Sequence, residues 1–288
     1  MEKISQKYSL SVDEEQISAT VETAKQLAKN INPEALKQCF NSIDLTALNT
    51  TDTISQIRQM TEKVSNFSNV YHDLPNVAAI CVYPALVSTV RKNLSDKNVR
   101  IASVTAGFPA SQTFIDVKIK ESLLAIENGA DEIDIVISVG RFLEKNYEFV
   151  YSEIEQIKQA VGDTHVKVIL ETGALKDLQL IRIASLLAME GGADFIKTST
   201  GKFYDTATPE AVCAMCMAIA DYKAQSGRNV GIKPSGGIST AAETLVYYNI
   251  LKSTLGEKWQ NNKLFRIGAS RLANNLLTDI TGLEAKYF

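Results

Sequence analysis

Short apolar segments recur along the chain, and longer segments with helical periodicity separate them. Strands that alternate with helices predict βα units and a parallel sheet. The predicted helices include 54–67, 113–128, 147–161, 175–190, 209–224 and 240–255. The predicted strands are 42–45, 77–82, 100–105, 132–137, 166–171, 194–197, 230–233 and 265–268.

This pattern decides between two arrangements of a parallel sheet. Eight strand–helix units are typical of a closed (β/α)8 barrel of about 250 residues, and the chain has 288. An open doubly wound sheet usually carries a glycine-rich turn after its first strand. Here Thr46-Ala47-Leu48-Asn49 follows that strand instead. We therefore predict an α/β fold, a (β/α)8 or TIM barrel, with an additional N-terminal helical segment.

Capping residues mark several helix starts. Ser11 with Glu14 and Thr240 with Glu243 fit the capping box, and Asn32 and Thr208 each precede a proline. Residues 1–40 precede the first strand, so we expect a helical extension packed on the barrel and covering its bottom. Residues 41–288 form the barrel catalytic domain with a C-terminal tail.

Composition excludes several classes of protein. The net charge of −3 and the pI near 5.6 disfavour an electrostatic nucleic-acid binder. No apolar stretch approaches the roughly 20 residues of a membrane span, and the N-terminus lacks the apolar core of a signal peptide. We therefore predict no nucleic-acid partner, no membrane association and a cytoplasmic location.

The cysteines and histidines do not form a metal-binding pattern. Cys213 and Cys216 are spaced as C-x-x-C, but they lie in a predicted helix, without a second cysteine pair or a nearby histidine. His72 and His165 lie far apart in the sequence. We predict free thiols in a reducing compartment and no metal ion. The remaining cysteines are Cys39 and Cys81.

Several predicted strands carry charged residues on one face. Successive strand side chains point to opposite faces, and the apolar faces must pack on the surrounding helices. The charged faces should therefore point into the barrel. An interior that serves only stability is filled mostly by Val, Ile and Leu. Such a charged interior favours catalysis, with a structural ion-pair network as the alternative. The residues expected to converge there are Asp44, Asp134, Lys167, Glu171, Lys197 and Lys233.

Lys197 ends an apolar strand and is followed by a Thr/Ser/Gly turn. A buried lysine that loses its proton is a nucleophile, typically one that forms a Schiff base with a carbonyl substrate. Lowering its pKa from ~10.4 to 7–8 takes about 4 kcal/mol of differential interaction. Lys233 could supply part of this as a like charge. Asp134 is then a candidate for proton transfer, and Asp44 could hold Lys233.

Glycine-containing loops follow the last three predicted strands. They contain Gly201-Lys202, then Pro234-Ser235-Gly236-Gly237-Ile238, and finally Gly268-Ala269-Ser270. Any one loop could simply make a tight turn. Three such loops, beside a catalytic-looking lysine and running into helix N-termini, favour a phosphorylated substrate because they expose backbone N–H groups.

These stretches, together with five others, resemble the deoxyribose-phosphate aldolases, class I aldolases with a (β/α)8 barrel. The resemblance runs in family order from residue 42 to about 272, and the N-terminal forty residues resemble the extension of longer members. The Lys197 and Lys233 motifs are its most specific parts. The other matching stretches are 43–46, 79–84, 103–109, 129–134 and 171–175.

The resemblance implies reversible cleavage of 2-deoxy-D-ribose 5-phosphate to D-glyceraldehyde 3-phosphate and acetaldehyde, without a cofactor or metal ion. It implies that Lys197 forms the Schiff base, Lys233 lowers its pKa and Asp134 shuttles protons. Asp44 belongs to the proton-relay region. The implied substrate-binding residues are Thr46, Cys81, Lys167, Thr198, Gly201, Lys202, Gly236, Gly237, Gly268 and Ser270, of which Gly201, Lys202, Gly236, Gly237, Gly268 and Ser270 line the phosphate pocket.

Departures from the family pattern occur at the phosphate loops and at the C-terminus. Ser239 stands where some members have arginine, and Arg271 where a second serine is common. Some members end in a tyrosine that folds into the site, whereas here Tyr287 is penultimate.

Other functions remain open from the residues alone. A different Schiff-base aldolase or transaldolase would share the lysine and the barrel. A non-covalent phosphosugar isomerase would use a carboxylate base, and a sugar-phosphate binding protein would need only the glycine loops. In each case the expected partner is a phosphorylated sugar, and a homo-oligomer is compatible with the sequence.

Overall fold

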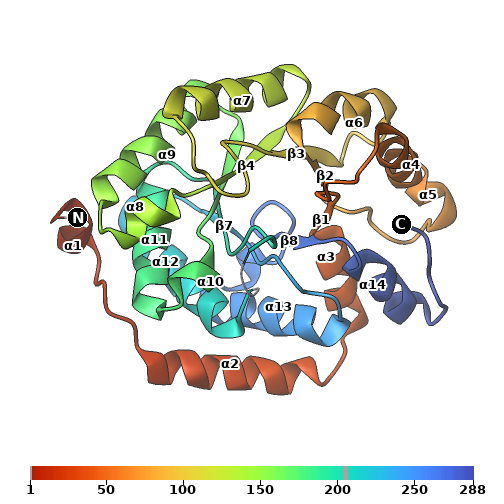
Figure 1. The fold of residues 1–288 in the computed structure, drawn as a ribbon. Coiled ribbons are helices and arrows are strands. Elements are labelled where there is room, and N and C mark those ends of the chain that lie inside the picture. The colour runs from red at the N-terminus through yellow and green to blue at the C-terminus, as the bar shows by residue number, and fades with distance from the viewer. Residues whose placement is uncertain (1, 204–206) are drawn as a thin grey trace.

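A ring of parallel strands surrounded by helices forms the molecule (Figure 1). The computed structural model describes residues 2–203 and 207–288. Each strand from β1 to β6 pairs in parallel with the next, and β8 pairs with β1. Parallel bridges from Ile232 to Phe265 and from Ser235 to Gly268 close the ring. The strands are β1 (Ile43–Thr46), β2 (Ala79–Val82), β3 (Arg100–Val104), β4 (Glu132–Val136), β5 (His165–Ile169), β6 (Phe195–Lys197), β7 (Gly231–Lys233) and β8 (Ile267–Ala269).

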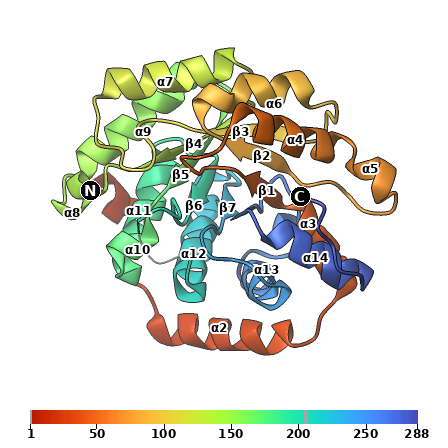
Figure 2. The same ribbon diagram turned by 45° about the vertical axis from the view of Figure 1, so that its right-hand side comes forward.

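The predicted (β/α)8 barrel is therefore confirmed, and every predicted strand is present within two residues at each end. The helices after the strands form the outer layer (Figure 2). They are α4 (Ile54–Ser65), α5 (Phe67–Val70), η1 (Pro84–Leu86), α6 (Val87–Asn93), α7 (Ile115–Glu127), α8 (Val139–Leu143), α9 (Tyr147–Val161), α10 (Thr172–Leu175), α11 (Leu178–Glu190), α12 (Pro209–Ser226), α13 (Ala241–Leu255), η2 (Glu257–Trp259) and α14 (Leu272–Thr281).

The predicted helix 175–190 begins later than expected, at Leu178. Lys176 has a positive φ of 62°, which interrupts the helical path. The side chain of Asp177 then accepts a hydrogen bond from the Leu180 N–H and caps α11.

The two faces of the strands separate as their sequence pattern predicts. On β4, Ile133 and Ile135 belong to the apolar core of the helical layer, whereas Asp134 lies buried inside the barrel. Strands β2 and β3 instead place small apolar residues inside, in a cluster of Leu48, Ala79, Cys81, Ala102 and Val104. The barrel interior is therefore apolar on the side of β2 and β3 and charged elsewhere.

The N-terminal segment contains α1 (Glu2–Lys7), α2 (Glu14–Ala28) and α3 (Pro33–Asn41); Met1 lies outside the described residues. Helix α2 packs on α12 and α13 from outside the ring, rather than beneath the barrel as we expected (Figures 1 and 2). It buries Ile17, Val21, Ala24 and Ala28 against these helices.

The predicted capping residues agree with the structure except at α2. Asp13, and not Ser11, caps α2, because its side chain accepts the Gln16 N–H at 2.9 Å. Thr240 and Glu243 form the predicted capping box of α13. Asn32 and Thr208 cap α3 and α12 ahead of their prolines, as predicted.

All four cysteines are buried and free. Within residues 2–203 and 207–288, no group of three or more His, Cys, Asp or Glu side chains is placed to hold a metal ion. In the same ranges, none of the helices has both the length and the apolar character needed to cross a membrane.

Candidate active site

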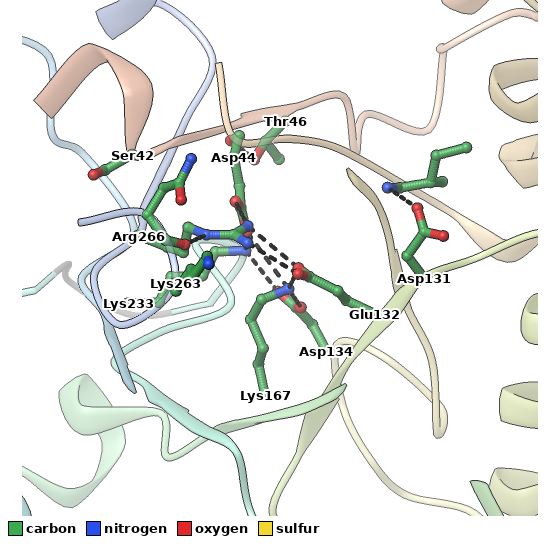
Figure 3. Close-up of polar contacts among 12 residues, drawn as sticks. Ser42, Asp44, Thr46, Asp131, Glu132, Asp134, Lys167, Lys233, Lys263 and Arg266 are labelled. Atoms are coloured by element: carbon green, nitrogen blue, oxygen red, sulfur yellow. Dashed lines mark hydrogen bonds and ion pairs between the residues drawn. The ribbon is translucent and has the colours of Figure 1, made fainter. Parts of the chain in front are cut away.

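Seven charged side chains form one cluster inside the barrel, and each is at most 5% exposed. Figure 3 shows how most of them point toward one another from different strands. The cluster contains four cations and three carboxylates. They are Asp44 on β1, Glu132 and Asp134 on β4, Lys167 on β5, Lys197 on β6, Lys233 on β7 and Arg266 directly before β8.

Lys197 and Lys233 are neighbours in register on β6 and β7. Both ammonium nitrogens lie 2.8 Å from the same oxygen, Oδ2 of Asp134. Lys233 Nζ also lies 2.5 Å from Oδ2 of Asp44. The two predicted catalytic lysines therefore share one carboxylate, and among residues 2–203 and 207–288 only Lys233 has a second one.

Lys167 and Arg266 lie deeper in the barrel. Lys167 is in register with Phe195, two residues before Lys197. Its Nζ lies 2.6 Å from Glu132, 2.9 Å from Asp134 and 3.6 Å from Asp44. Arg266 contacts Asp44 at 2.7 Å and Glu132 at 2.9 Å (Figure 3).

Burial and charge pairing shift the pKa values of the two lysines in opposite directions. Burial lowers the pKa of Lys197 and outweighs the charge of Asp134, which raises it. The charge of Lys233 lowers this pKa further. Burial also opposes the charge on Lys233, but Asp134 and Asp44 together raise the pKa of Lys233. The amine most easily freed of its proton is therefore Lys197.

The carboxylates of the cluster stay ionised. Burial alone would raise the pKa of Asp134, but Lys167, Lys197 and Lys233 hold it well below the usual range. Burial alone would likewise raise the pKa of Asp44. The charges of Lys233, Arg266 and Lys167 outweigh burial, so the pKa of Asp44 is lowered.

A cavity of about 380 Å³ opens above Lys197 at the carboxyl ends of the strands. The predicted phosphate loops after β6, β7 and β8 all reach it, and so does the segment after β1. Enzymes with this fold bind their substrates at this face. The lining residues are Thr46, Leu48, Asn49, Lys197, Thr200, Gly201, Lys202, Ser235, Gly236, Gly237, Ile238, Ser239, Gly268, Ala269, Ser270 and Arg271.

Two glycines show why these loops need small residues. Gly237 has a φ of +71°, in the left-handed region that side chains rarely adopt. At Gly268, a Cβ atom would lie 2.8 Å from the Ser235 Cβ and 3.2 Å from the Lys233 Cε. Backbone approach at β8 therefore depends on glycine.

Two exposed cationic side chains line the cavity, Lys202 and Arg271. Lys202 Nζ donates a hydrogen bond to the Leu48 carbonyl at 2.5 Å, which holds the lysine across the cavity mouth. Ser239 lies in the same lining, so the serine and the arginine that depart from the family pattern lie at one site.

Some predicted substrate-binding residues do not line this cavity in the described part of the chain. Lys167 lies a layer deeper, among carboxylates. The Thr198 hydroxyl is engaged by the Ser235 backbone, with its N–H at 2.9 Å and its carbonyl at 3.1 Å. Cys81 is buried among apolar residues, and burial raises the pKa of its thiol.

The prediction that Glu171 joins the charged interior is wrong. Glu171 has a φ of +55°, which turns it away from the line of β5. Its carboxylate instead accepts hydrogen bonds from the Thr200 hydroxyl at 2.5 Å and the Thr200 N–H at 3.2 Å. It therefore fixes the loop that follows Lys197.

Sequence reasoning missed Glu132 and Arg266 as cluster members. The signal was present, because Glu132 shares its strand face with Asp134 and Arg266 lies two residues before the inward Gly268.

The C-terminal tail lies away from the cavity. The Tyr287 hydroxyl donates a hydrogen bond to the Lys63 carbonyl at 2.6 Å, near the end of α4. Its ring packs against Phe67 and Tyr71, and Phe288 stacks on Phe67. Tyr287 is therefore part of an aromatic cluster outside the barrel.

Comparison with solved structures supports the fold. A structure from Toxoplasma gondii ME49 matches with a TM-score of 0.78 at 24% identity, covering 87% of this chain and 95% of that one. The deoxyribose phosphate aldolase of Aeropyrum pernix matches with a TM-score of 0.68 at 24% identity, covering 90% of this chain and 98% of that one.

Sequence comparison shows the family. Deoxyribose-phosphate aldolase from Homo sapiens is 40% identical over 266 residues, which cover 88% of this chain and 84% of the human protein. The Mus musculus enzyme is 38% identical over 281 residues, covering 93% of this chain and 88% of the mouse protein. The family model described as DeoC/LacD family aldolase matches residues 40–252. The chain therefore belongs to the DeoC/LacD aldolase family.

Proposed function

We propose that this protein cleaves 2-deoxy-D-ribose 5-phosphate reversibly to D-glyceraldehyde 3-phosphate and acetaldehyde through a Schiff base on Lys197. The observation that carries the proposal is a buried lysine with a lowered pKa at the base of a cavity lined by three glycine loops. The human and mouse relatives, which carry the name of this activity, support it.

The reaction begins with the neutral amine of Lys197. It attacks the C1 aldehyde of the open-chain sugar, and loss of water from the resulting carbinolamine gives an iminium ion. A base removes the C3 hydroxyl proton, and the C2–C3 bond breaks to release D-glyceraldehyde 3-phosphate. The electron pair of that bond forms the C1–C2 double bond of an enamine, while the π pair of the iminium moves to the nitrogen. Protonation of C2 and hydrolysis then release acetaldehyde and restore the amine.

We assign these proton transfers to Asp134. Its Oδ2 lies 2.8 Å from Lys197 Nζ, where the carbinolamine and iminium form. Its negative charge also stabilises the iminium in a buried site. We infer that a water in the cavity relays the proton between Asp134 and the substrate carbon.

The substrate phosphate is assigned to the glycine loops. Gly236, Gly237 and Ser270 line a cavity that is also lined by the cationic side chains of Lys202 and Arg271. Charge-assisted hydrogen bonds of this kind are the strong ones in phosphate recognition. The phosphate then lies at the mouth and the aldehyde at Lys197.

A non-covalent isomerase is less well supported. It would use a carboxylate base and has no need of a neutral amine. Here burial lowers the pKa of Lys197 and prepares an amine nucleophile at the base of the cavity, which an isomerase would leave unused.

The test is acetaldehyde release from deoxyribose 5-phosphate, followed by coupling to alcohol dehydrogenase and NADH, with and without EDTA. We expect release that EDTA leaves unchanged and that Lys197→Met abolishes. Lys97→Met, at an exposed lysine outside the cavity, is the matched control and should retain full activity. Absence of acetaldehyde, or activity retained in Lys197→Met, would contradict the proposal.

A further inference from the structure

The buried cluster does not balance its charges when every member is ionised. Four cations face three carboxylates, which leaves one surplus positive charge. In residues 2–203 and 207–288, the carboxylates paired with these cations are Asp44, Glu132 and Asp134. A buried charge without a partner is costly, so one proton is expected to leave the cluster.

The pairing pattern decides which cation gives up its proton. Lys197 has one carboxylate partner, Asp134, which it shares with two other lysines. Lys233 has two carboxylate partners and Lys167 has three. Lys197 is therefore the least compensated lysine.

Arg266 differs from the three lysines because a guanidinium stays charged in proteins. It is 5% exposed and held by Asp44 and Glu132. Its Nε also donates to the Asn262 carbonyl, and its guanidinium lies 5.8 Å from the centre of the Phe195 ring. Arg266 thus places a permanent positive charge beneath the lysines.

We propose that Arg266 is a positioning residue. Its fixed charge, which Glu132 partly offsets, gives the cluster the surplus positive charge that keeps Lys197 neutral and nucleophilic. This proposal rests on the proposed function, because it explains how the Schiff-base amine is kept ready. In this account Lys233 is one contributor among several, and the charge state of the whole cluster sets the reactivity of Lys197.

The groups around Lys197 come from most strands of the barrel, and the directions of their pKa values agree with this account. Against the effect of burial, carboxylates raise the pKa values of Lys167, Lys233 and Arg266. Cys81 on β2 adds a buried thiol whose pKa burial raises, and β3 adds the apolar Ala102 and Val104. The ionisable groups that surround Lys197 are Asp44, Cys81, Glu132, Asp134, Lys167, Lys233 and Arg266.

Three variants test the charge count, each measured as the pH profile of kcat/KM. Arg266→Gln removes the surplus, so Lys197 keeps its proton and the acidic limb should move to higher pH. Glu132→Gln enlarges the surplus, so the limb should move to lower pH. The double variant restores the original surplus and should return the limb toward wild type. A buried unit charge about 10 Å away shifts a pKa by about one unit at an effective dielectric constant near 20.

A second readout does not depend on aldolase activity. Cyanate carbamylates neutral amines, so the rate of Lys197 modification at each pH reports its neutral fraction, with the site located by peptide mass mapping. The same opposite shifts are expected. If they occur without acetaldehyde release, the proposed function fails and this inference stands.

Arg182→Gln is the matched control, because Arg182 is also a buried arginine paired with a carboxylate, Asp221, but lies in the outer helix α11. It should leave both profiles unchanged. Thermal melting checks that each variant folds. Unshifted profiles in folded Arg266→Gln and Glu132→Gln, or shifts in the same direction in both, would overturn the inference.

Discussion

Lys197 and Lys233 occupy equivalent places on adjacent strands, yet their surroundings give them different chemistry. Lys233 contacts both Asp44 and Asp134, whereas the carboxylate that Lys197 contacts in the described part of the chain is Asp134. A lysine with two carboxylate partners is stabilised as a cation, whereas a buried lysine with a single, shared carboxylate partner loses its proton more easily. This difference, at the level of single contacts, assigns the nucleophile.

Replacing Lys233 tests this reading of the pair. In Lys233→Leu a positive charge leaves the site, so the pKa of Lys197 rises toward its usual value. Activity at neutral pH should fall, and part of it should return at higher pH, where Lys197 deprotonates unaided. The measurement is the pH dependence of kcat/KM, and an acidic limb that stays in place would show that Lys233 does not perturb Lys197.

At the scale of elements, the loops after β6, β7 and β8 meet around one cavity although more than sixty residues separate the first from the last. Their closeness follows from the parallel barrel, since all strands end at the same face. The loop after β7 depends on its backbone conformation, because Gly236 and Gly237 both have positive φ values.

Gly237→Val should damage phosphate binding specifically. Valine is β-branched and does not adopt the φ of +71° found at this position, so the loop must move away from the phosphate. We expect KM to rise far more for deoxyribose 5-phosphate than for unphosphorylated deoxyribose, with kcat largely kept.

Gly162→Val is the matched control for this loop. Gly162 also has a positive φ, +59°, but it lies after α9 with open space around it. The control should lose stability without changing the ratio of the two KM values. An equal loss on both substrates in Gly237→Val would place the phosphate elsewhere.

Helix α2 stabilises the barrel from outside through its buried face. Ile17 is 1% exposed between α2 and the outer layer. Ile17→Ala should lower the free energy of unfolding by about 2–5 kcal/mol, as buried Ile-to-Ala changes do, and leave KM unchanged. Urea unfolding measures the effect, with the exposed Glu15→Ala as control. A loss below 0.5 kcal/mol would show that α2 packs only weakly.

Across the whole molecule, strand and helix periodicity was sufficient to predict the barrel, because inside and outside residues alternate on strands such as β4. The same alternation brought Asp44, Asp134, Lys197 and Lys233 together correctly. It failed at Glu171, where a positive φ ends the alternation. Local backbone conformation of this kind leaves little trace in a single sequence.

Other features depended on packing partners that the sequence does not name. The amphipathic pattern of α2 shows that one face is buried, but not whether the helix lies under the barrel or beside α13. Likewise, Arg266 is an inward residue by its spacing, but its pairing with Glu132 and Asp44 requires the closed ring. Long-range pairing is therefore where the structure added most.

The central claim is that Lys197 forms the covalent intermediate, and borohydride trapping tests it most directly. The protein is incubated with acetaldehyde and sodium borohydride, and the modified residue is found by peptide mass mapping. We predict one ethyl group on Lys197, with loss of activity in proportion to its formation. Modification of another lysine, with Lys197 untouched and activity intact, would contradict the account.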